Sequence, residues 1–463
     1  MHPVCPLSLS HARIFVLADV WARWKRKQGF SVRFPICMHY SGSTVFKITN
    51  AVSNFLQKQK LNDVDKKTLD LIFNFYKIPK KHLHKFTEPI SVLDYFSDII
   101  LKDLRSIQVS CDYNDYFNTT NQRYQEFVCS VFDIYREKRF ITIHNNNKSL
   151  NYPDLLFRNL AVNRLNETKF SLPTAKAMVA ESLDKLDDEW SFERNDSIGT
   201  CIDEYIIDPM FDAEFLSIFN AIYPYLKDLA INQSNARDIF KEFLHKIKNP
   251  DKKVSSIASE LYSNSQEILP IDIFFVERHL QNWVAKRIYT ETILLPPHLS
   301  THEYFFLGSI TKNSHVDSAS RGHGTTLSQL IEIAGPENAR LTLLLSFGAP
   351  HKDYEWASTT EHIKRKLTKF NKFVDNLKRC SIDKKHQYNV TNTLKGMRKE
   401  IENLIECGNT RKILLLIFDE LPKVIQPMLT NSSQKNNTKK VLSFLGEYLN
   451  ILCPSLNSKL YEN

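Results

Sequence analysis

Glycine is scarce in this sequence, with 11 residues among 463. Glycine lets a backbone approach a bound phosphate closely, so few positions remain where a nucleotide could be held in that way. The eight cysteines form no C-x-x-C pair, which argues against a zinc knuckle or a redox motif. We therefore expect no metal site, and we expect free, mostly buried thiols in a reducing, cytoplasmic compartment.

Long apolar runs are also missing. No signal peptide and no stretch able to span a bilayer can be recognised. What remains is ordinary for a globular chain, at 42% hydrophobic and 24% charged residues, and the length suits about three domains. The formal net charge of +9 is a mild basic excess, which is compatible with a polyanionic partner.

The first forty residues carry the most informative pattern. Apolar residues recur there at helical spacing, namely Ile14, Leu17, Val20, Trp21 and Trp24. Ser8 and Ser10 stand where an N-cap would be, Gly29 follows as a stop, and residues 30–36 read as a short strand. A loop, a long helix and a buried strand begin a nucleotide-binding α/β half-domain, whose helix N-terminus offers N–H groups to a phosphate.

This stretch resembles the first signature region of class I aminoacyl-tRNA synthetases, most closely leucyl-tRNA synthetases of the archaeal and eukaryotic kind. The matching residues are Ala18-Asp19-Val20, Arg23-Trp24-Lys25-Arg26, Gly29, His39, Gly42 and Ser43. The family's His-x-Gly-His falls on Ser8-Leu9-Ser10-His11, so only the last histidine is kept. The strand before this loop is expected to be missing, because the chain starts at Met1.

The resemblance continues through an ordered series of partial motifs. It implies a Rossmann-like catalytic domain with its first half at 1–144 and its second half at 196–300. Helices are expected through 44–110, and a strand at 140–144 would complete the first half. The 51 residues of 145–195 are a short connective segment where the family inserts its editing domain, so proofreading of mischarged tRNA is predicted to be absent.

The second signature of the family, Lys-Met-Ser-Lys-Ser, is degenerate here. Within 301–357, both signature lysines are replaced, by Val316 and Ala319. The resemblance leaves a remnant nucleotide site made of Ser8, Ser10, His11, Ser318, Ser320, Arg321 and Gly322. It likewise implies an amino-acid pocket made of His39, Gly42, Ser43 and Asp212.

Residues 358–463 read as a helical bundle of the anticodon-binding type. Its first helix has an apolar stripe at 4-3-4-3 spacing, namely Ile363, Leu367, Phe370, Val374 and Leu377. Further helices are expected near 389–406, 410–429 with a bend at Pro422, and 441–452. By resemblance, tRNA contacts are expected from Arg340, Trp356, Lys364, Arg365, Lys369 and Lys372.

Each of these residues also has a plainer interpretation. His11 either still donates to a phosphate or only caps and packs its helix, with equal weight. Arg321 is better explained as a solvated loop charge than as a rescue cation. His39 is favoured as a contact for a small ligand over a satisfied loop histidine, and the basic helix at 363–379 is favoured as an RNA-binding face over a merely solvated one.

The leading hypothesis is a diverged leucyl-tRNA-synthetase-like protein that binds tRNA, of the leucine type by resemblance, or aminoacyl-tRNA, with amino acid activation weak or lost. One alternative is an active leucine–tRNA ligase with a rebuilt ATP site and no editing. Another is a non-catalytic interaction protein on the same scaffold. No cofactor is expected to be required, although ATP with Mg²⁺ would serve if activation is retained; no membrane and no DNA partner is expected.

Overall fold

The computed structural model describes residues 2–144, 147–151, 155–186, 189–194, 197–202, 205–229, 231–232, 234–276, 283–307, 310–312, 315–316, 318–319, 322, 324–346, 356–430 and 438–461. The chain divides into two compact units. The first consists of Met1–Cys5, Pro35–Asp98 and Asp112–Phe306, and the second consists of Pro6–Phe34, Ile99–Cys111 and Leu307–Asn463. Each unit is described by itself.

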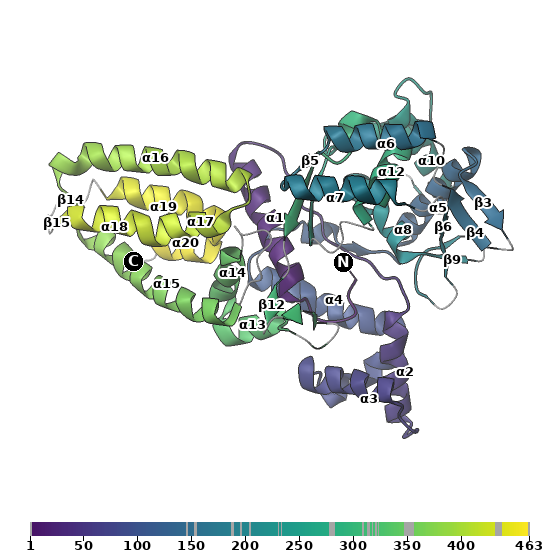
Figure 1. Ribbon diagram of the computed structural model, residues 1–463, viewed down its shortest axis with the longest axis horizontal. Coiled ribbons are helices and arrows are strands. Elements are labelled where there is room, and N and C mark those ends of the chain that lie inside the picture. The colour runs from purple at the N-terminus through teal and green to yellow at the C-terminus, as the bar shows by residue number, and fades with distance from the viewer. Residues whose placement is uncertain are drawn as a thin grey trace. The chain divides into compact units, whose positions relative to one another are not determined.

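The first unit begins with short parallel pairing and a helical excursion. Strand β1 (Cys37–Met38) pairs in parallel with β2 (Phe117–Asn118), with Cys37 opposite Phe117. Between them the chain forms helices that Figure 1 shows in purple and blue, namely α2 (Thr44–Leu56), α3 (Asp63–Asp70) and α4 (Pro89–Ser106), with a 3₁₀ helix at Lys80–Thr87. The part of α4 from Ile99 onward belongs to the second unit. The helices expected within 44–110 are confirmed. On the 3₁₀ helix, the side chains of Lys81 and Lys85 are exposed.

The strand expected at 30–36 is not formed, and this prediction was wrong. The segment is irregular, and regular pairing starts only at Cys37. Pro35 has no N–H to give to a ladder. The carbonyl of Val32 instead accepts a hydrogen bond from the Arg26 guanidinium at 3.2 Å.

The rest of the first unit contains both helices and strands. The remaining helices of this unit are α5 (Gln122–Glu137), α6 (Leu155–Glu167), α7 (Pro173–Asp184), α8 (Pro209–Glu214), α9 (Leu216–Ile222), α10 (Ala236–Lys248), α11 (Ser256–Gln266) and α12 (Ala285–Leu294). The remaining strands are β3 (Ile141–His144), β4 (Asn147–Asn151), β5 (Lys169–Phe170), β6 (Glu189–Ser191), β7 (Glu193–Arg194), β8 (Cys201–Ile202), β9 (Tyr205–Ile207), β10 (Asp272–Val276) and β11 (Glu303–Leu307).

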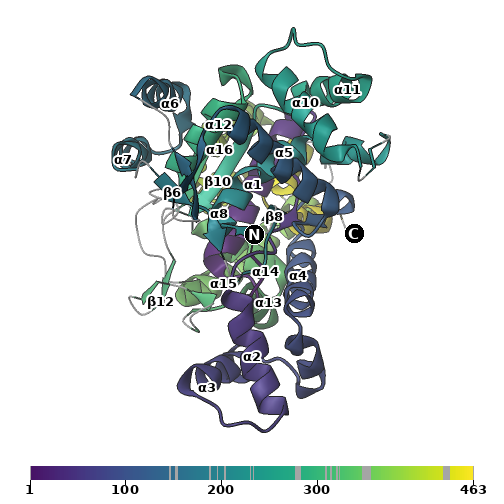
Figure 2. The same cartoon turned by 90° about the vertical axis from the view of Figure 1, so that its right-hand side faces the viewer.

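The pairing of these strands corrects one detail of the sequence interpretation. The strand expected at 140–144 exists as β3, but it forms an antiparallel hairpin with β4, which in turn pairs with β6. The strand that pairs in parallel with β11 is β5, in a sheet of order β10-β11-β5. Helices α6 and α7 flank β5 and lie side by side (Figure 1, Figure 2). The segment 145–195 therefore contributes a strand, β5, to the β10-β11-β5 sheet.

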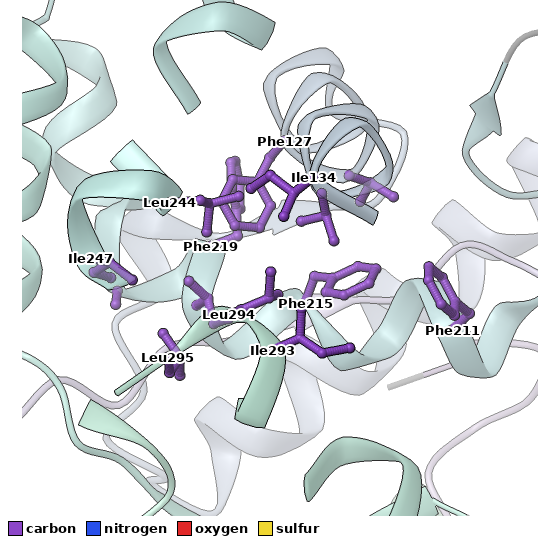
Figure 3. Close-up of a cluster of buried hydrophobic side chains, with 14 of the residues drawn as sticks. Phe127, Ile134, Phe211, Phe215, Phe219, Leu244, Ile247, Ile293, Leu294 and Leu295 are labelled. Carbon is purple, nitrogen blue, oxygen red and sulfur yellow. The ribbon is translucent and has the colours of Figure 1, made fainter. Parts of the chain in front are cut away.

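Aromatic side chains fill the core of this unit. Phe127, Phe211, Phe215 and Phe219 lie among the aliphatic side chains of α5, α10 and α12 (Figure 3). On the β10-β11-β5 sheet, Phe170 and Phe306 stack at 5.8 Å between ring centroids. Aromatic burial of this density stabilises a fold strongly, since each ring removes a large apolar area from water.

The second unit combines a long helix with a helical bundle. It contains α1 (Leu9–Lys27), α13 (Leu327–Ala334), α14 (Pro336–Leu345), α15 (Trp356–Arg379), α16 (Gln387–Glu406), α17 (Thr410–Leu415), α18 (Leu421–Ile425), α19 (Lys439–Leu452) and α20 (Pro454–Tyr461), with short strands β12 (Thr311–Lys312), β13 (His315–Val316), β14 (Ser381–Ile382) and β15 (Leu429–Thr430). The bundle helices are confirmed within a few residues of their expected bounds.

The apolar stripe of α15 is buried as its spacing predicts. Ile363, Leu367, Phe370, Val374 and Leu377 are all buried. A π-helical turn at Leu416–Glu420 joins α17 to α18, and Pro422 follows it in the first turn of α18, where a missing N–H is tolerated.

Candidate functional site

The first candidate site is the N-terminus of α1 in the second unit. Ser8 is the N-cap, and its Oγ lies 2.8 Å from Nδ1 of His11. The backbone N–H of His11 donates to Ser8 Oγ at 3.4 Å, which is the N-cap hydrogen bond, and to the carbonyl of Ser8 at 3.1 Å. These are the contacts that the capping interpretation of His11 requires.

Backbone pairing closes the same helix end. Ser8 and Thr326 form an antiparallel bridge. The N–H of Leu327 donates to Leu7 O at 2.7 Å, and the N–H of Leu9 donates to Thr325 O at 3.4 Å. Ser10 is only 4% exposed, so its hydroxyl is closed to a nucleotide in solution.

The remnant of the second signature is partly described. Gly322 has a φ of +70° and its N–H donates to Ala319 O at 3.1 Å, so this stretch is a tight turn. Ala319 is buried, and Ser318 is half-buried. Ser320 and Arg321 lie outside the described residues.

Taken together, these residues do not fit a bound triphosphate. Such a ligand needs N–H groups and cations directed at its oxygens. Here the N–H groups of Leu9 and His11 bond to protein carbonyls, and Ala319 offers no cation.

The second candidate site lies around His39 in the first unit. His39 is 8% exposed, and its Nε2 lies 3.1 Å from Oδ2 of Asp212. The hydroxyl of Ser41 lies 3.1 Å from Nδ1. The same hydroxyl lies 3.1 Å from Nε2 as well, so Asp212 and Ser41 hold the imidazole in place without selecting one tautomer.

Asp212 is fully buried and serves as the centre of this cluster. Its Oδ1 accepts from the Thr200 hydroxyl at 3.2 Å, and its backbone carbonyl accepts from the Tyr124 hydroxyl at 2.5 Å. Burial raises the pKa of Tyr124 well above its ordinary value, so this hydroxyl stays a donor. Both carboxylate oxygens are thus occupied, and the cluster is a positioning network around the imidazole.

The loop backbone beside His39 is shaped by glycine. Gly42 has a φ of +90°, and it exchanges two hydrogen bonds with Ile198, at 2.7 and 3.2 Å. A Cβ at Gly199 would lie 3.2 Å from Cγ2 of Ile206, so a side chain there would require Ile206 to shift by a few tenths of an ångström. Ser43 is exposed at the start of α2, so it is not part of the pocket as the sequence interpretation had it.

His2 joins this pocket and was missed from the sequence. Its Nδ1–H donates to His39 O at 3.1 Å, and Gly42 lies against its ring. Burial lowers the pKa of His2 to about 4, so the ring is neutral at physiological pH. Like Ser41, Thr200 and Tyr124, it is brought to His39 by the fold, and no local spacing in the sequence signals it.

Arg340 corrects the expected set of RNA contacts in the second unit. Its side chain is 1% exposed and forms an ion pair with the fully buried Asp19. It also donates to Leu452 O at 2.6 Å and to Ile107 O at 3.0 Å. A guanidinium buried in this way cannot contact RNA, so Arg340 is a structural residue. Trp356 begins α15, but its side chain lies outside what the structure describes.

The basic face of α15 is exposed. Lys364 is half-buried and pairs with Glu361 at 3.0 Å. The exposed cations follow one stripe at spacings of four, three and seven residues, opposite the buried one, namely Arg365, Lys369, Lys372 and Arg379. Lys369 and Lys372 have no ion-pair partner among the described residues.

All eight cysteines are free thiols, and three of them, Cys111, Cys129 and Cys453, are buried. Cys201 and Cys407 are exposed, which corrects the expectation of mostly buried thiols. Among the described residues, no group of three His, Cys, Asp or Glu side chains is placed to hold a metal ion. Within the same part of the chain, no helix combines the length and apolarity that crossing a membrane requires.

The sequence is similar to archaeal leucyl-tRNA ligases over part of its length. It is 30% identical to Leucine--tRNA ligase 2 of Sulfurisphaera tokodaii over 140 residues, which is 30% of this chain and 14% of that protein. It is 29% identical to Leucine--tRNA ligase of Methanopyrus kandleri over 140 residues, with the same coverage. No protein-family model matches the chain.

The fold is similar to class I synthetases over nearly the whole chain. A methionyl-tRNA synthetase of Mycobacterium tuberculosis bound by methionyl-adenylate superimposes with a TM-score of 0.65 at 11% identity, covering 99% of this chain and 92% of that one. A putative arginyl-tRNA synthetase from Campylobacter jejuni gives 0.52 at 13% identity, covering 99% and 90%.

The chain has the fold of class I synthetases, and 30% of its length is similar in sequence to leucyl-tRNA ligases. The fold expected from the sequence, a Rossmann-like domain followed by a helical domain, is confirmed. The similarity in sequence is confined to a fraction of the leucyl ligases, so their activity is not transferred to this chain by the comparison.

Proposed function

We propose that this leucyl-tRNA-synthetase-like protein binds tRNA, or aminoacyl-tRNA, in the cytoplasm and activates amino acids weakly or not at all. The observation that carries the loss of activation is the closed N-terminus of α1. His11 contacts its own N-cap Ser8, and the N–H of Leu9 bonds to Thr325 O. Activation needs those groups to face the phosphates of ATP.

The loss extends to the second signature. The positions of both signature lysines hold Val316 and Ala319. Removing a single donor that stabilises the transition state typically costs about 10²–10³ in rate. Several such losses in one site therefore account for weak or absent activation, although the separate effects need not add.

ATP–pyrophosphate exchange with each of the twenty amino acids tests this part of the proposal. We expect no exchange above the background without amino acid. Robust leucine-dependent exchange would overturn it and would favour the active ligase. The feature that favours that rival is the intact His39–Asp212 cluster, which still offers a shaped polar pocket.

Binding of tRNA is supported by α15. Its exposed stripe holds cations that the described part of the protein does not neutralise, including Lys369 and Lys372. Phosphate contacts of this kind bind RNA without reading its sequence, and salt weakens them. The alternative of a non-catalytic interaction protein with the synthetase fold predicts that no tRNA is retained on a filter at low salt.

The double variant Lys369→Glu/Lys372→Glu is expected to weaken tRNA retention at least tenfold. It should also make the dependence of log K on log salt shallower by about 1.4 to 1.8, the equivalent of two phosphate contacts. Filter binding over a range of salt concentrations measures both quantities. The matched control is Lys81→Glu/Lys85→Glu, which changes the net charge equally on another exposed helical face. Equal weakening by the two variants would mean that only net charge matters.

A further inference from the structure

The first residue behind this inference is Tyr388. It lies at the start of α16 and is 76% exposed, the highest value among the exposed large hydrophobic residues in the described part of the chain. Among the described residues, no ring stacks on Tyr388 and no group forms a hydrogen bond with its hydroxyl. A tyrosine ring exposed in this way contributes little apolar burial to the fold. Both of its faces are open to a ligand.

Three polar residues continue the line that Tyr388 begins. Asn392, Lys395 and Lys399 follow at spacings of four, three and four residues, and all are exposed. These spacings place the four side chains on one face of α16. The opposite face is buried in the bundle through Val390, Leu394, Ile401, Leu404 and Ile405. We call the exposed line of Tyr388, Asn392, Lys395 and Lys399 the α16 stripe.

The two lysines of the α16 stripe are not neutralised by the protein. Neither has an ion-pair partner among the described residues, whereas neighbouring charges on the helix do. Arg398 pairs with Glu447 at 2.7 Å, and Glu400 pairs with Lys412 at 2.8 Å. Glu402 lies one turn beyond Lys399 and ends the positive stretch. Like charges four residues apart destabilise a helix slightly, so this arrangement contributes nothing to the fold.

The bundle holds this helix firmly. The ion pair between Arg398 and Glu447 ties α16 to α19, and the buried face packs on the bundle core. Figure 1 shows α16 along one edge of the bundle. Along the axis, Tyr388 and Lys395 are about 10 Å apart, and Lys395 and Lys399 about 6 Å, from the helical rise. The α16 stripe is therefore a fixed row of an aromatic ring, an amide and two ammonium groups.

From this row we propose that the α16 stripe binds a single-stranded segment of RNA, an inference that deepens the proposed tRNA binding and rests on it for the identity of the RNA. An unpaired base stacks on Tyr388, and the backbone phosphates that follow lie at Lys395 and Lys399. Asn392 supplies a hydrogen-bonding amide between them. Stacking requires a base free of its own helix, so a loop or an end fits and a continuous duplex does not.

Fluorescence anisotropy with a labelled octaadenylate tests the α16 stripe directly on the full chain. Tyr388→Ala is expected to weaken binding about tenfold, the loss typical of one stacked base, and Tyr388→Phe should stay within twofold because it keeps the ring. Lys395→Gln/Lys399→Gln should make the dependence of log K on log salt shallower by about 1.4. A blunt-ended RNA duplex should bind Tyr388→Ala and the unchanged protein equally.

The controls separate this inference from the proposed function. Lys81→Gln/Lys85→Gln matches the charge change on an exposed face of the first unit and should leave octaadenylate binding unchanged. If the protein retains no tRNA but Tyr388→Ala still weakens octaadenylate binding, the proposed function fails and the stripe stands. If tRNA is retained but octaadenylate binds every variant equally, or does not bind, the inference is overturned. Equal losses in Tyr388→Ala and Tyr388→Phe would also overturn it, since they would point to the hydroxyl.

Discussion

Replacing Arg340 by methionine should lower the free energy of unfolding of the second unit by about 3–5 kcal/mol. The change leaves the carboxylate of Asp19 fully buried without its main partner, and it also removes the donors to Leu452 O and Ile107 O. Breaking one side of a buried ion pair costs this much because the remaining charge stays desolvated. Urea denaturation followed by circular dichroism measures the loss.

Arg23→Met is the matched control for this prediction. Arg23 also pairs with Asp19, at 2.9 Å, but its side chain is 20% exposed, so we expect a loss of about 1 kcal/mol or less. The double variant Asp19→Leu/Arg340→Met should recover part of the stability, because no charge is then left buried. Equal losses for Arg340→Met and Arg23→Met would contradict the assignment of Arg340 as the principal partner.

The same ion pair predicts a loss of stability in acid. Burial alone would raise the pKa of Asp19, but Arg340 and Arg23 outweigh it, and the pKa lies below its ordinary value. A lowered pKa contributes stability above the ordinary value for aspartate, and that contribution is lost as the pH falls through the lowered one.

The helices of this protein were predictable because their information is local. The stripe from Ile363 to Leu377 needs only the helical period to predict which face is buried. The prediction of a strand at 30–36 was wrong because the residue pattern of this segment does not show whether another strand is available to pair with it. The Val32 carbonyl accepts a hydrogen bond from Arg26 instead. Pairing depends on distant residues, which a local pattern does not contain.

Arg340 and His39 show the same limit at single residues. The place of Arg340 in the series of synthetase-like motifs suggested that it contacts RNA. In the structure it pairs with Asp19, which lies 321 residues away in the sequence. His39 and Asp212 were both placed in one pocket by resemblance, and the structure does bring them within 3.1 Å. Their supporting residues Ser41, Thr200 and Tyr124 were missed, since ordinary serine, threonine and tyrosine carry no signal of a buried network.

Glu214 should make the first unit less stable as the pH rises through neutrality. This residue is 1% exposed, and burial raises the pKa of its carboxyl to about 8, against the lowering effects of the Thr290 hydroxyl and Arg287. The folded state therefore keeps its proton to about pH 8, whereas an unfolded glutamate loses it near its ordinary pKa of 4.5. Stability is complete below the unfolded value and falls as the pH rises towards the folded one, by at most about 1.4 kcal/mol for each pH unit.

Glu214→Gln should remove that dependence, because glutamine stays neutral and keeps an acceptor for the Thr290 hydroxyl. The difference in unfolding free energy between the variant and the unchanged protein should grow in favour of the variant from about pH 5 to pH 8, by a few kcal/mol. His2 acts in the opposite direction, since burial lowers its pKa to about 4 and acid destabilises it, but it is present in both proteins and cancels. Urea denaturation at pH 5, 6, 7 and 8 measures the difference, and a difference that does not change with pH would show that Glu214 is ionised in the folded protein.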